Sequence, residues 1–419
     1  MVQLLKTTLQ TQSAFKEALP VLTRIQSAGY EAYFVGGSIR DALLNKPIHD
    51  IDIATSAYPS EVQAIFPKHF DVGLEHGTVM ALVDGETYEI TTFRTESGYQ
   101  DYRRPDQVTF VRQLEDDLLR RDFTINALAM DTTGQVWDYF TGLADLETKT
   151  LRAVGQAKAR FHEDALRMMR AVRFMSQLDF TLDPETEKAL AANAPLLAKI
   201  AVERVRVEME KLWVGVAWQR GIEKLVTTEL YRFCPLLSNQ AETLSQLEQL
   251  LSEKVRFTSA ELAWAVLVFV SEQGEEPLSV DKVSREWKLS NKQKQKIATL
   301  VDALNVRIVG PWQAVDVYQV GIVAAKTVEE WITHQQQAHA PLAQQWTPGA
   351  VDELEQTWAA LPIHSKKELA LNGGDIIQTF HPDDKPQIGA MLNAAEEAVV
   401  AGVVINERVA ILEYLAHHF

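Results

Sequence analysis

The chain has 419 residues, of which 46% are hydrophobic and 23% charged, and its formal net charge is −16 at pH 7. This composition excludes a disordered or fibrous protein, and the length predicts about two to four domains. The longest strongly apolar stretches, such as residues 262–270, are shorter than the ~20 residues that cross a bilayer, so no membrane segment is expected. The beginning of the sequence lacks a signal pattern, and the single Cys234 excludes an internal disulfide or a cysteine-based metal cage, which indicates a cytoplasmic protein.

Helix and strand patterns alternate over the first 150 residues. Apolar residues at helical spacing predict a helix over residues 13–29, a strand over 33–35 follows, and a second helix begins near Ser38. Further elements are expected as strands at residues 50–54, 78–83, 87–93, 108–111 and 136–139, and as a helix at 59–66. These patterns predict a mixed α/β domain.

The strand pattern ends near residue 150, and residues 161–177, 185–192 and 202–212 have helical spacing. We therefore predict an α+β protein whose remainder is all-α. The predicted domain boundaries are residues 1–150, 151–215, 216–310 and 311–419. The boundaries beyond residue 215 depend on the proline-containing stretches near 310–311 and 341–348.

Charge is distributed unevenly along the chain. Residues 151–215 contain 11 basic and 9 acidic side chains, whereas residues 1–150 contain 13 and 22, and residues 216–419 contain 17 and 26. Nucleic-acid affinity depends on lysines and arginines that neutralise phosphates, so the middle segment is the expected basic surface for an RNA.

Two glycines, Gly36 and Gly37, end the first predicted strand and precede a helix that begins with Ser38. Glycine backbone lets a phosphate approach closely, and the N–H groups at a helix start attract anions. Arg40 on this helix would bind the phosphate in bidentate fashion. An isolated Gly-Gly pair is also typical of a tight turn.

Ten residues after Arg40 the sequence reads Asp50-Ile51-Asp52. In a strand both carboxylates would lie on one face, with Ile51 pointing into the core. Two adjacent carboxylates repel unless a cation neutralises them, and oxygen ligands that leave room for substrate phosphates suit Mg²⁺. A solvated strand end is the alternative, but the preceding glycine turn favours a magnesium site. Asp50 and Asp52 are therefore the predicted catalytic and metal-binding residues.

A third polar cluster, Arg120-Arg121-Asp122, precedes an apolar segment that we expect to be helical. Arg121 is the predicted triphosphate contact, and a helix cap or an ion pair is the alternative. Glu89, on a later strand, is a candidate third carboxylate at the metal site; an exposed strand residue is at least as consistent with its position.

The motifs occur in a fixed order: GGSIRD, DID and RRDFTINA, then Asp138-x3-Gly142-x2-Asp145-Leu146, Glu163-Asp164-x2-Arg167 and Glu203-Arg204. This series resembles the class II tRNA nucleotidyltransferases, the CCA-adding enzymes, in their shorter bacterial form, and runs through about half of the chain. The resemblance implies a polymerase-β-like catalytic head (1–150), a neck that recognises the base (151–215), a helical body (216–310) and a tRNA-binding tail (311–419). Residues 372–375 and 402–406 resemble that tail, whereas residues 382–389 depart from its glycine-proline pattern.

The resemblance also implies an activity, which is template-independent addition and repair of the 3′-terminal CCA of tRNA from CTP and ATP. The tRNA 3′ end, the two nucleotides and Mg²⁺ would be its partners. The tRNA 3′-hydroxyl would attack the α-phosphorus in line and release pyrophosphate, with metal held by Asp50 and Asp52. Gly37, Arg40 and Arg121 would contact the nucleotide.

Base selection is expected on a helix over residues 161–174, where Asp164, Arg167 and Arg170 step by three residues and span about 120° of the surface. Cytosine and adenine both present an amino donor beside a ring-nitrogen acceptor, so an Asp acceptor beside an Arg donor would accept C or A and reject U and G. The resemblance implies the same role for Asp164 and Arg167 and associates Arg170 and Arg173 with nucleotide binding. Arg173 lies roughly opposite Asp164 on an ideal helix. An amphipathic helix with Asp–Arg pairs is the alternative.

The polar segment 95–106, with Arg103 and Arg104, resembles the flexible loop that such enzymes need for the change from CTP to ATP. A solvated hairpin connection has the same composition. The loop favours full CCA synthesis over a CC-adding enzyme. Because the only adjacent His-Asp pair is His49-Asp50, inside the metal motif, no separate hydrolase module is expected.

Three other classes of protein compete with this interpretation. A bacterial poly(A) polymerase would share the head and neck, but the acidic total and the lack of a basic C-terminal extension disfavour it. A non-catalytic RNA-binding protein would not need Asp50, Asp52 and Arg121. A small-molecule nucleotidyltransferase would not need a long helical body and tail.

Overall fold

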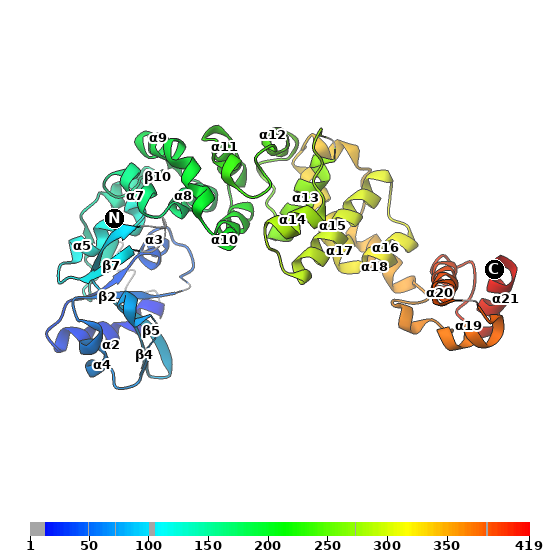
Figure 1. Cartoon of the computed structure of the whole chain (residues 1–419), viewed down its shortest axis with the longest axis horizontal. Helices are drawn as coiled ribbons and strands as arrows, with labels where there is room; N and C mark the ends of the chain where they lie inside the picture. The colour runs from blue at the N-terminus through cyan, green and yellow to red at the C-terminus, as the bar shows by residue number, and fades with distance from the viewer. Residues whose placement is uncertain (1–12, 49, 72, 100–104, 273, 383) are drawn as a thin grey trace. The chain divides into compact units, whose positions relative to one another are not determined.

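The structure is a computed structural model that describes residues 13–419 except 49, 72, 100–104, 273 and 383 (Figure 1). The chain forms two compact units, Met1–Ala241 and Glu242–Phe419. Within the described residues, no helix is both long and apolar enough to span a membrane. Short 3₁₀ turns connect the larger elements at η1 (Leu74–His76), η2 (Thr124–Asn126), η3 (Ala194–Lys199), η4 (Leu230–Phe233), η5 (Leu342–Gln345) and η6 (Lys366–Glu368).

A seven-stranded mixed sheet forms the centre of the first unit, with strand order β3-β4-β5-β2-β1-β8-β9. Its strands are β1 (Ala32–Val35), β2 (Asp52–Thr55), β3 (His69–Phe70), β4 (Thr78–Val83), β5 (Glu86–Thr92), β8 (Leu128–Met130) and β9 (Val136–Asp138). Among the described pairings of this sheet, β2 and β5 are parallel and the others are antiparallel. The predicted mixed α/β domain is confirmed.

Helices cover both faces of this sheet, because successive residues of a strand point to opposite faces. Phe34 of β1 packs on Phe15 of α2 (Ser13–Ser27), with the two ring centroids 4.9 Å apart. On the other side, Val35 shares a buried cluster with Leu114 and Leu118 of α5 (Leu114–Leu119). The helix α4 (Pro59–Ile65) lies beside α2 (Figure 1). The helices α3 (Gly37–Leu43) and α6 (Gly142–Glu147) complete this part.

The apolar segment after Arg121 is not the helix that we expected. It forms β8 (Leu128–Met130), which pairs with β1 and β9 and is buried throughout. A short apolar run that is buried on both faces of a sheet has no alternation, so its periodicity does not distinguish a strand from a helix.

The polar segment 95–106 begins and ends in an antiparallel hairpin. The hairpin consists of β6 (Arg94–Tyr99) and β7 (Pro105–Phe110), which form a separate two-stranded sheet. Arg103 and Arg104 lie outside the described residues. The hairpin alternative therefore accounts for both described ends of the segment, and the role of the loop stays a prediction.

Helices dominate the rest of the first unit, as predicted. They are α7 (Ala157–Glu163), α8 (Leu166–Leu178), α9 (Pro184–Asn193), α10 (Val202–Trp213) and α11 (Trp218–Thr227). Two short parallel strands, β10 (Thr150–Leu151) and β11 (Thr181–Leu182), were not predicted. The continuous helix predicted over residues 161–177 is wrong, because the backbone at Asp164 is extended, with φ −133° and ψ 102°.

The helix α8 is buried between α10 and α11, and Gly215 permits this close packing. A Cβ at Gly215 would lie 1.8 Å from the Ser176 Oγ and 2.7 Å from the Ser176 carbonyl oxygen. We expect Gly215→Ala to lower the free energy of unfolding by about 1–3 kcal/mol, because backbone atoms of α8 must move. Denaturant unfolding measures this change. Gly389→Ala, at an exposed helical position with open space around it, is the matched control, and an equal loss in both variants would contradict the prediction.

The regular elements of the second unit are all helices over its described residues, in agreement with the predicted all-α remainder. Its helices are α13 (Ala260–Ser271), α14 (Val280–Glu286), α15 (Asn291–Val309), α16 (Ala314–Val320), α17 (Ile322–Gln337), α18 (Val351–Ala360), α19 (Gly373–Phe380), α20 (Lys385–Val400) and α21 (Arg408–His418); α12 (Ala241–Leu250) begins at the boundary between the units. The helix α13 is buried from Leu262 onward and packs on α15. A second core contains Ile376, Met391 and Leu415.

Candidate active site

A cleft of about 870 Å³ in the first unit brings together most of the residues predicted from the sequence. The predicted residues that line it are Gly37, Arg40, Asp50, Asp52, Arg121, Asp164, Arg167, Arg170 and Arg173. They come from α3, the start of β2, the segment after α5, and the α7–α8 region. Residues more than 100 positions apart in the sequence therefore share one polar cavity.

The glycine turn, Gly36 and Gly37, lines the cleft. At Gly36 there is no room for a side chain. Its φ is 75°, in the left-handed region that favours glycine. A Cβ at this position would lie 2.9 Å from the Arg121 Nη1 and 3.8 Å from the Asp52 Oδ2. The turn therefore lets the Arg121 guanidinium lie directly against the backbone beside Asp52.

Asp52 is the first residue of β2, and Asp50 precedes this strand, so the predicted strand 50–54 begins two residues too early. Both carboxylates line the cleft, as predicted. Strand alternation is not the reason, because only Asp52 belongs to the strand. Loss of water around the partly exposed Asp52 carboxylate raises its pKa; Asp50 adds to this effect and Arg121 opposes it. A divalent cation between these carboxylates would remove their repulsion, so the donor set fits a magnesium ion.

Glu89 pairs in parallel register with Asp52, on the neighbouring strand β5. Its side chain is exposed and does not line the cleft. In the part of the chain that the structure describes, no three or more His, Cys, Asp or Glu side chains form a metal-binding group. A metal-binding role for Glu89 stays a prediction.

Arg40 and Arg121, the predicted phosphate contacts, are oriented by neighbouring acceptors. The Nε and Nη2 of Arg40 donate to both Asp41 carboxylate oxygens at 2.9 Å, and its Nη1 donates to the Asn126 side chain. The Arg121 Nη2 donates to Asp117 at 3.3 Å. A phosphate that binds Arg40 in bidentate fashion would compete with Asp41 for the same two nitrogens.

Asp122 follows the arginine pair in the sequence; it is buried and accepts hydrogen bonds. It accepts hydrogen bonds from the Phe123 backbone N–H at 2.8 Å, the Asn126 side chain at 3.0 Å and the Arg170 Nε at 2.7 Å. Burial by itself would raise the pKa of Asp122, but Arg170, Asn126 and Arg167 lower it by more, so the pKa is well below its usual range. Asp122 therefore carries a permanent negative charge that holds Arg170 in the cleft.

Arg173 is buried on α8, and its Nε lies 3.0 Å from the Glu208 Oε2 of α10. Burial, with the adjacent Arg170, lowers the pKa of Arg173 to about 10, and Glu208 opposes this shift. The guanidinium therefore stays charged at neutral pH. Although we expected Arg173 roughly opposite Asp164, both line the same cleft, since the break before α8 changes the direction of Asp164.

Asp164 and Arg167, the predicted base readers, each have a partner in the protein. The Asp164 carboxylate accepts from the Leu166 backbone N–H at 3.1 Å and from the Arg204 Nη2 at 3.0 Å. The Arg167 guanidinium donates to Glu163 at 3.0 Å and to the Arg120 carbonyl oxygen at 2.7 Å. Aspartate often bonds to a nearby backbone N–H instead of continuing a helix, which is the physical reason for the break.

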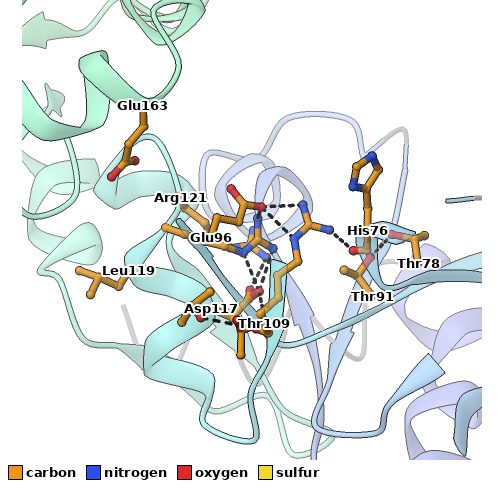
Figure 2. Close-up of polar contacts among 12 residues, drawn as sticks. His76, Thr78, Thr91, Glu96, Thr109, Asp117, Leu119, Arg121 and Glu163 are labelled. Atoms are coloured by element: carbon orange, nitrogen blue, oxygen red, sulfur yellow. Dashed lines mark hydrogen bonds and ion pairs between the residues drawn. The ribbon is translucent and has the colours of Figure 1, made fainter. Parts of the chain in front are cut away.

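Several residues that orient the site, among them Arg204, Asp117 and Glu96, received no role from the sequence. Arg204 holds Asp164, Asp117 holds the two consecutive arginines, and Glu96 bonds to Arg120 at 3.1 Å; Figure 2 shows the contacts of Asp117 and Glu96. The spacing of Asp117 from Arg120 and Arg121, at i,i+3 and i,i+4, would have indicated the second of these contacts. No local pattern connects the other two pairs, because they join distant segments.

A mixed sheet with a glycine turn, two adjacent carboxylates and a cleft lined with arginines defines a nucleotidyltransferase, since these groups are what a metal-bound nucleoside triphosphate requires. Three family models match the chain: "Poly A polymerase head domain" over residues 32–152, "Probable RNA and SrmB-binding site of polymerase A" over 179–240, and "tRNA nucleotidyltransferase domain 2 putative" over 255–415.

Known proteins that resemble the chain over nearly its whole length identify the family. The CCA-adding enzyme of Lactiplantibacillus plantarum is 48% identical over 97% of each chain, and that of Enterococcus faecalis is 46% identical over 96% of this chain and 95% of the relative. The crystal structure of the Bacillus stearothermophilus CCA-adding enzyme in complex with CTP superimposes with a TM-score of 0.83 at 40% identity, covering 97% and 98% of the two chains. The chain belongs to the CCA-adding enzymes, and it is a tRNA nucleotidyltransferase with a polymerase-β-like head.

Proposed function

We propose that the cleft binds Mg²⁺ through Asp50 and Asp52 and joins a nucleotide to the 3′ end of tRNA. The chain adds and repairs the 3′-terminal CCA of tRNA with CTP and ATP and uses no nucleic-acid template. One observation carries the assignment of the site: both carboxylates line the same cleft as the arginines in a chain 48% identical to a CCA-adding enzyme.

The chain's own residues supply binding and orientation. Arg121 and Arg40 neutralise the triphosphate, and the bare glycine turn beside them lets its oxygens approach the backbone. When bound at Asp50 and Asp52, Mg²⁺ would activate the attacking hydroxyl and stabilise the leaving oxygens. The buried charge of Asp122 fixes Arg170 in the same cleft, so the incoming nucleotide meets donors in fixed positions.

Base selection follows from the polarity of Asp164 and Arg167. The Asp164 carboxylate accepts a hydrogen bond from the amino group of cytosine or adenine, and Arg167 donates to the adjacent ring nitrogen. Arg204 and the Leu166 N–H already orient the Asp164 carboxylate. Uracil and guanine present the reverse order of donor and acceptor, so they face like groups in this pocket.

We expect Asp164→Ala to reduce the preference for CTP over UTP by about 10- to 100-fold, since one base-specific contact contributes about 1–3 kcal/mol of discrimination. Extension of a tRNA that ends before CCA, with each nucleotide offered separately, measures this ratio. Glu185→Ala, at an exposed position outside the cleft, removes the same charge and is the control. An unchanged nucleotide preference in Asp164→Ala would defeat the base-reading role.

Four domains are part of the proposal: a head (1–150), a neck (151–215), a body (216–310) that crosses the boundary between the two units at residue 241, and a tail that binds tRNA (311–419). The segment 95–106 would act as the flexible loop between CTP and ATP addition. A cytoplasmic location is proposed from the single Cys234 and from tRNA as the substrate.

The decisive experiment is extension of a tRNA that ends before CCA, followed at single-nucleotide resolution with Mg²⁺ and CTP, ATP or both. A generic oligonucleotide is the control. Addition that stops at CCA on tRNA alone is the expected result. Products that stop at CC would indicate a CC-adding enzyme, and long A tails on either RNA would indicate a poly(A) polymerase.

A further inference from the structure

Two carboxylates, Glu96 and Asp117, hold the arginines at the edge of the cleft. Glu96 lies on β6 and its side chain is only 9% exposed; Asp117 lies on α5 and is 1% exposed. Figure 2 shows both carboxylates with dashed contacts to the nitrogen atoms between them. Because these acids come from separate elements, they fasten the hairpin to the segment that carries the arginine pair.

The contacts of Glu96 join two guanidinium groups that would otherwise repel. Its Oε1 accepts from the Arg94 Nε at 2.8 Å and from the Arg120 Nη1 at 3.1 Å. Both arginines line the cleft. Burial lowers the pKa of Arg94, the neighbouring Arg120 lowers it further, and Glu96 opposes both effects. Without the Glu96 charge, these two partly buried cations would lose the carboxylate that both contact, although Asp117 would stay nearby.

Arg120 is held from a second side by Asp117, whose Oδ1 accepts from its Nε at 3.0 Å and its Nη2 at 2.7 Å. The pKa of Asp117 is below its usual value, because Arg120 and Arg121 outweigh the opposite effect of burial. The whole Arg120 side chain is thus fixed between two carboxylates. A side chain fixed at both edges of its guanidinium also restricts the backbone that carries it.

The Arg120 backbone is the point at which this cluster reaches base recognition. Its carbonyl oxygen accepts the Arg167 Nη2 at 2.7 Å, and Glu163 holds the Nη1 of the same guanidinium at 3.0 Å. A continuous set of contacts therefore runs from Glu96 through Arg120 to Arg167. Substitution of Glu96 would therefore change the environment of Arg167 indirectly, through Arg120.

We propose that Glu96 is a positioning residue for nucleotide selection: from β6 it holds Arg120, and through the Arg120 carbonyl oxygen it sets the place of Arg167. This inference rests on the proposed base-reading role of Arg167. Glu96 does not touch the nucleotide in this scheme. Its contribution is to keep one donor at the angle that matches the ring nitrogen of cytosine or adenine.

Glu96→Gln tests the proposal, because it removes the charge and keeps the shape. In the full chain, we expect the KM for CTP to rise and the preference for CTP over UTP to fall, each by about three- to tenfold. The KM for tRNA, the kcat for CTP and the Tm should stay nearly unchanged. Glu96→Asp, which keeps the charge, should recover most of the preference. Glu115→Gln, an exposed acid at the start of α5, is the control with the same charge change.

A double mutant separates positioning from a general structural role. In an Arg167→Ala background, Glu96→Gln should cause no further loss of nucleotide preference, since the residue through which it acts is absent. An additive loss in the double mutant, or a fall in Tm with equal changes in every kinetic constant, would overturn the proposal. If Arg167→Ala alone kept the full preference, the base-reading role itself would be wrong, which is a different failure.

Discussion

Asp52→Asn is expected to lower the kcat for nucleotide addition by about 10³-fold or more. The substitution keeps the size of the side chain but removes the charge that would hold Mg²⁺, and a bound metal ion contributes several kcal/mol to the transition state, with each ~1.4 kcal/mol worth a factor of ten. Asp50→Asn should have a comparable effect because it supplies the second carboxylate of the same cleft. Single-turnover extension of tRNA with saturating CTP measures the loss.

The fold and the affinity for tRNA should survive these two substitutions. Asp52 carries a raised pKa as a consequence of desolvation and of Asp50, so neutralising it relieves repulsion in the metal-free protein. Asp71→Asn, an exposed acid in the same unit that does not line the cleft, is the matched control. Substantial turnover in Asp50→Asn or Asp52→Asn would rule out this assignment of the metal ligands.

Glu329→Ala is expected to lower the free energy of unfolding of the second unit by about 3–5 kcal/mol. Glu329 on α17 and Arg307 on α15 form a fully buried ion pair, with 2.6 Å between Nε and Oε2. Glu329 also accepts from the Trp312 Nε1 at 2.9 Å, and Arg307 donates to Thr347 and Gly310 at 3.2 Å. Removing the acid would leave a buried guanidinium without its counter-charge.

Denaturant unfolding, followed through the tryptophans, measures this loss. Glu330→Ala is the control, because the neighbouring acid is exposed. The double substitution Arg307→Met with Glu329→Met should be much less destabilising than Glu329→Ala, since no unpaired charge stays buried. If the double variant lost as much stability as Glu329→Ala, the unpaired charge would not be the cause.

Much of the fold was predictable wherever a short segment has one apolar face. The strand at residues 78–83 and the helices α2 and α4 have boundaries within about two residues of their predicted positions. Those patterns are local, because strand alternation and helical spacing depend only on neighbours in the chain. The strand β8 was missed for the complementary reason, since burial on both faces removes the alternation.

The candidate site was likewise predictable from the sequence only in part. Paired aspartates, the glycine turn and the arginine pair are recognisable as residue types at fixed spacing, and their order along the chain resembles that of the family. The sequence did not show that Asp50 and Asp164 lie outside regular secondary structure. The structure places Asp50 before the strand and Asp164 in a break between two helices. At Asp164 the side chain accepts a backbone N–H, which competes with regular structure.

The sequence alone therefore determined the class of fold, the family, and most of the charged side chains that line the cleft. The tertiary structure decided which of those charges meet: Asp52 beside Arg121, Asp164 beside Arg204, and Arg120 between Asp117 and Glu96. The reason is physical. Hydrogen-bonding capacity and apolar periodicity belong to residues and short segments, whereas the partner of a charged group depends on how distant elements pack, and no local pattern encodes that.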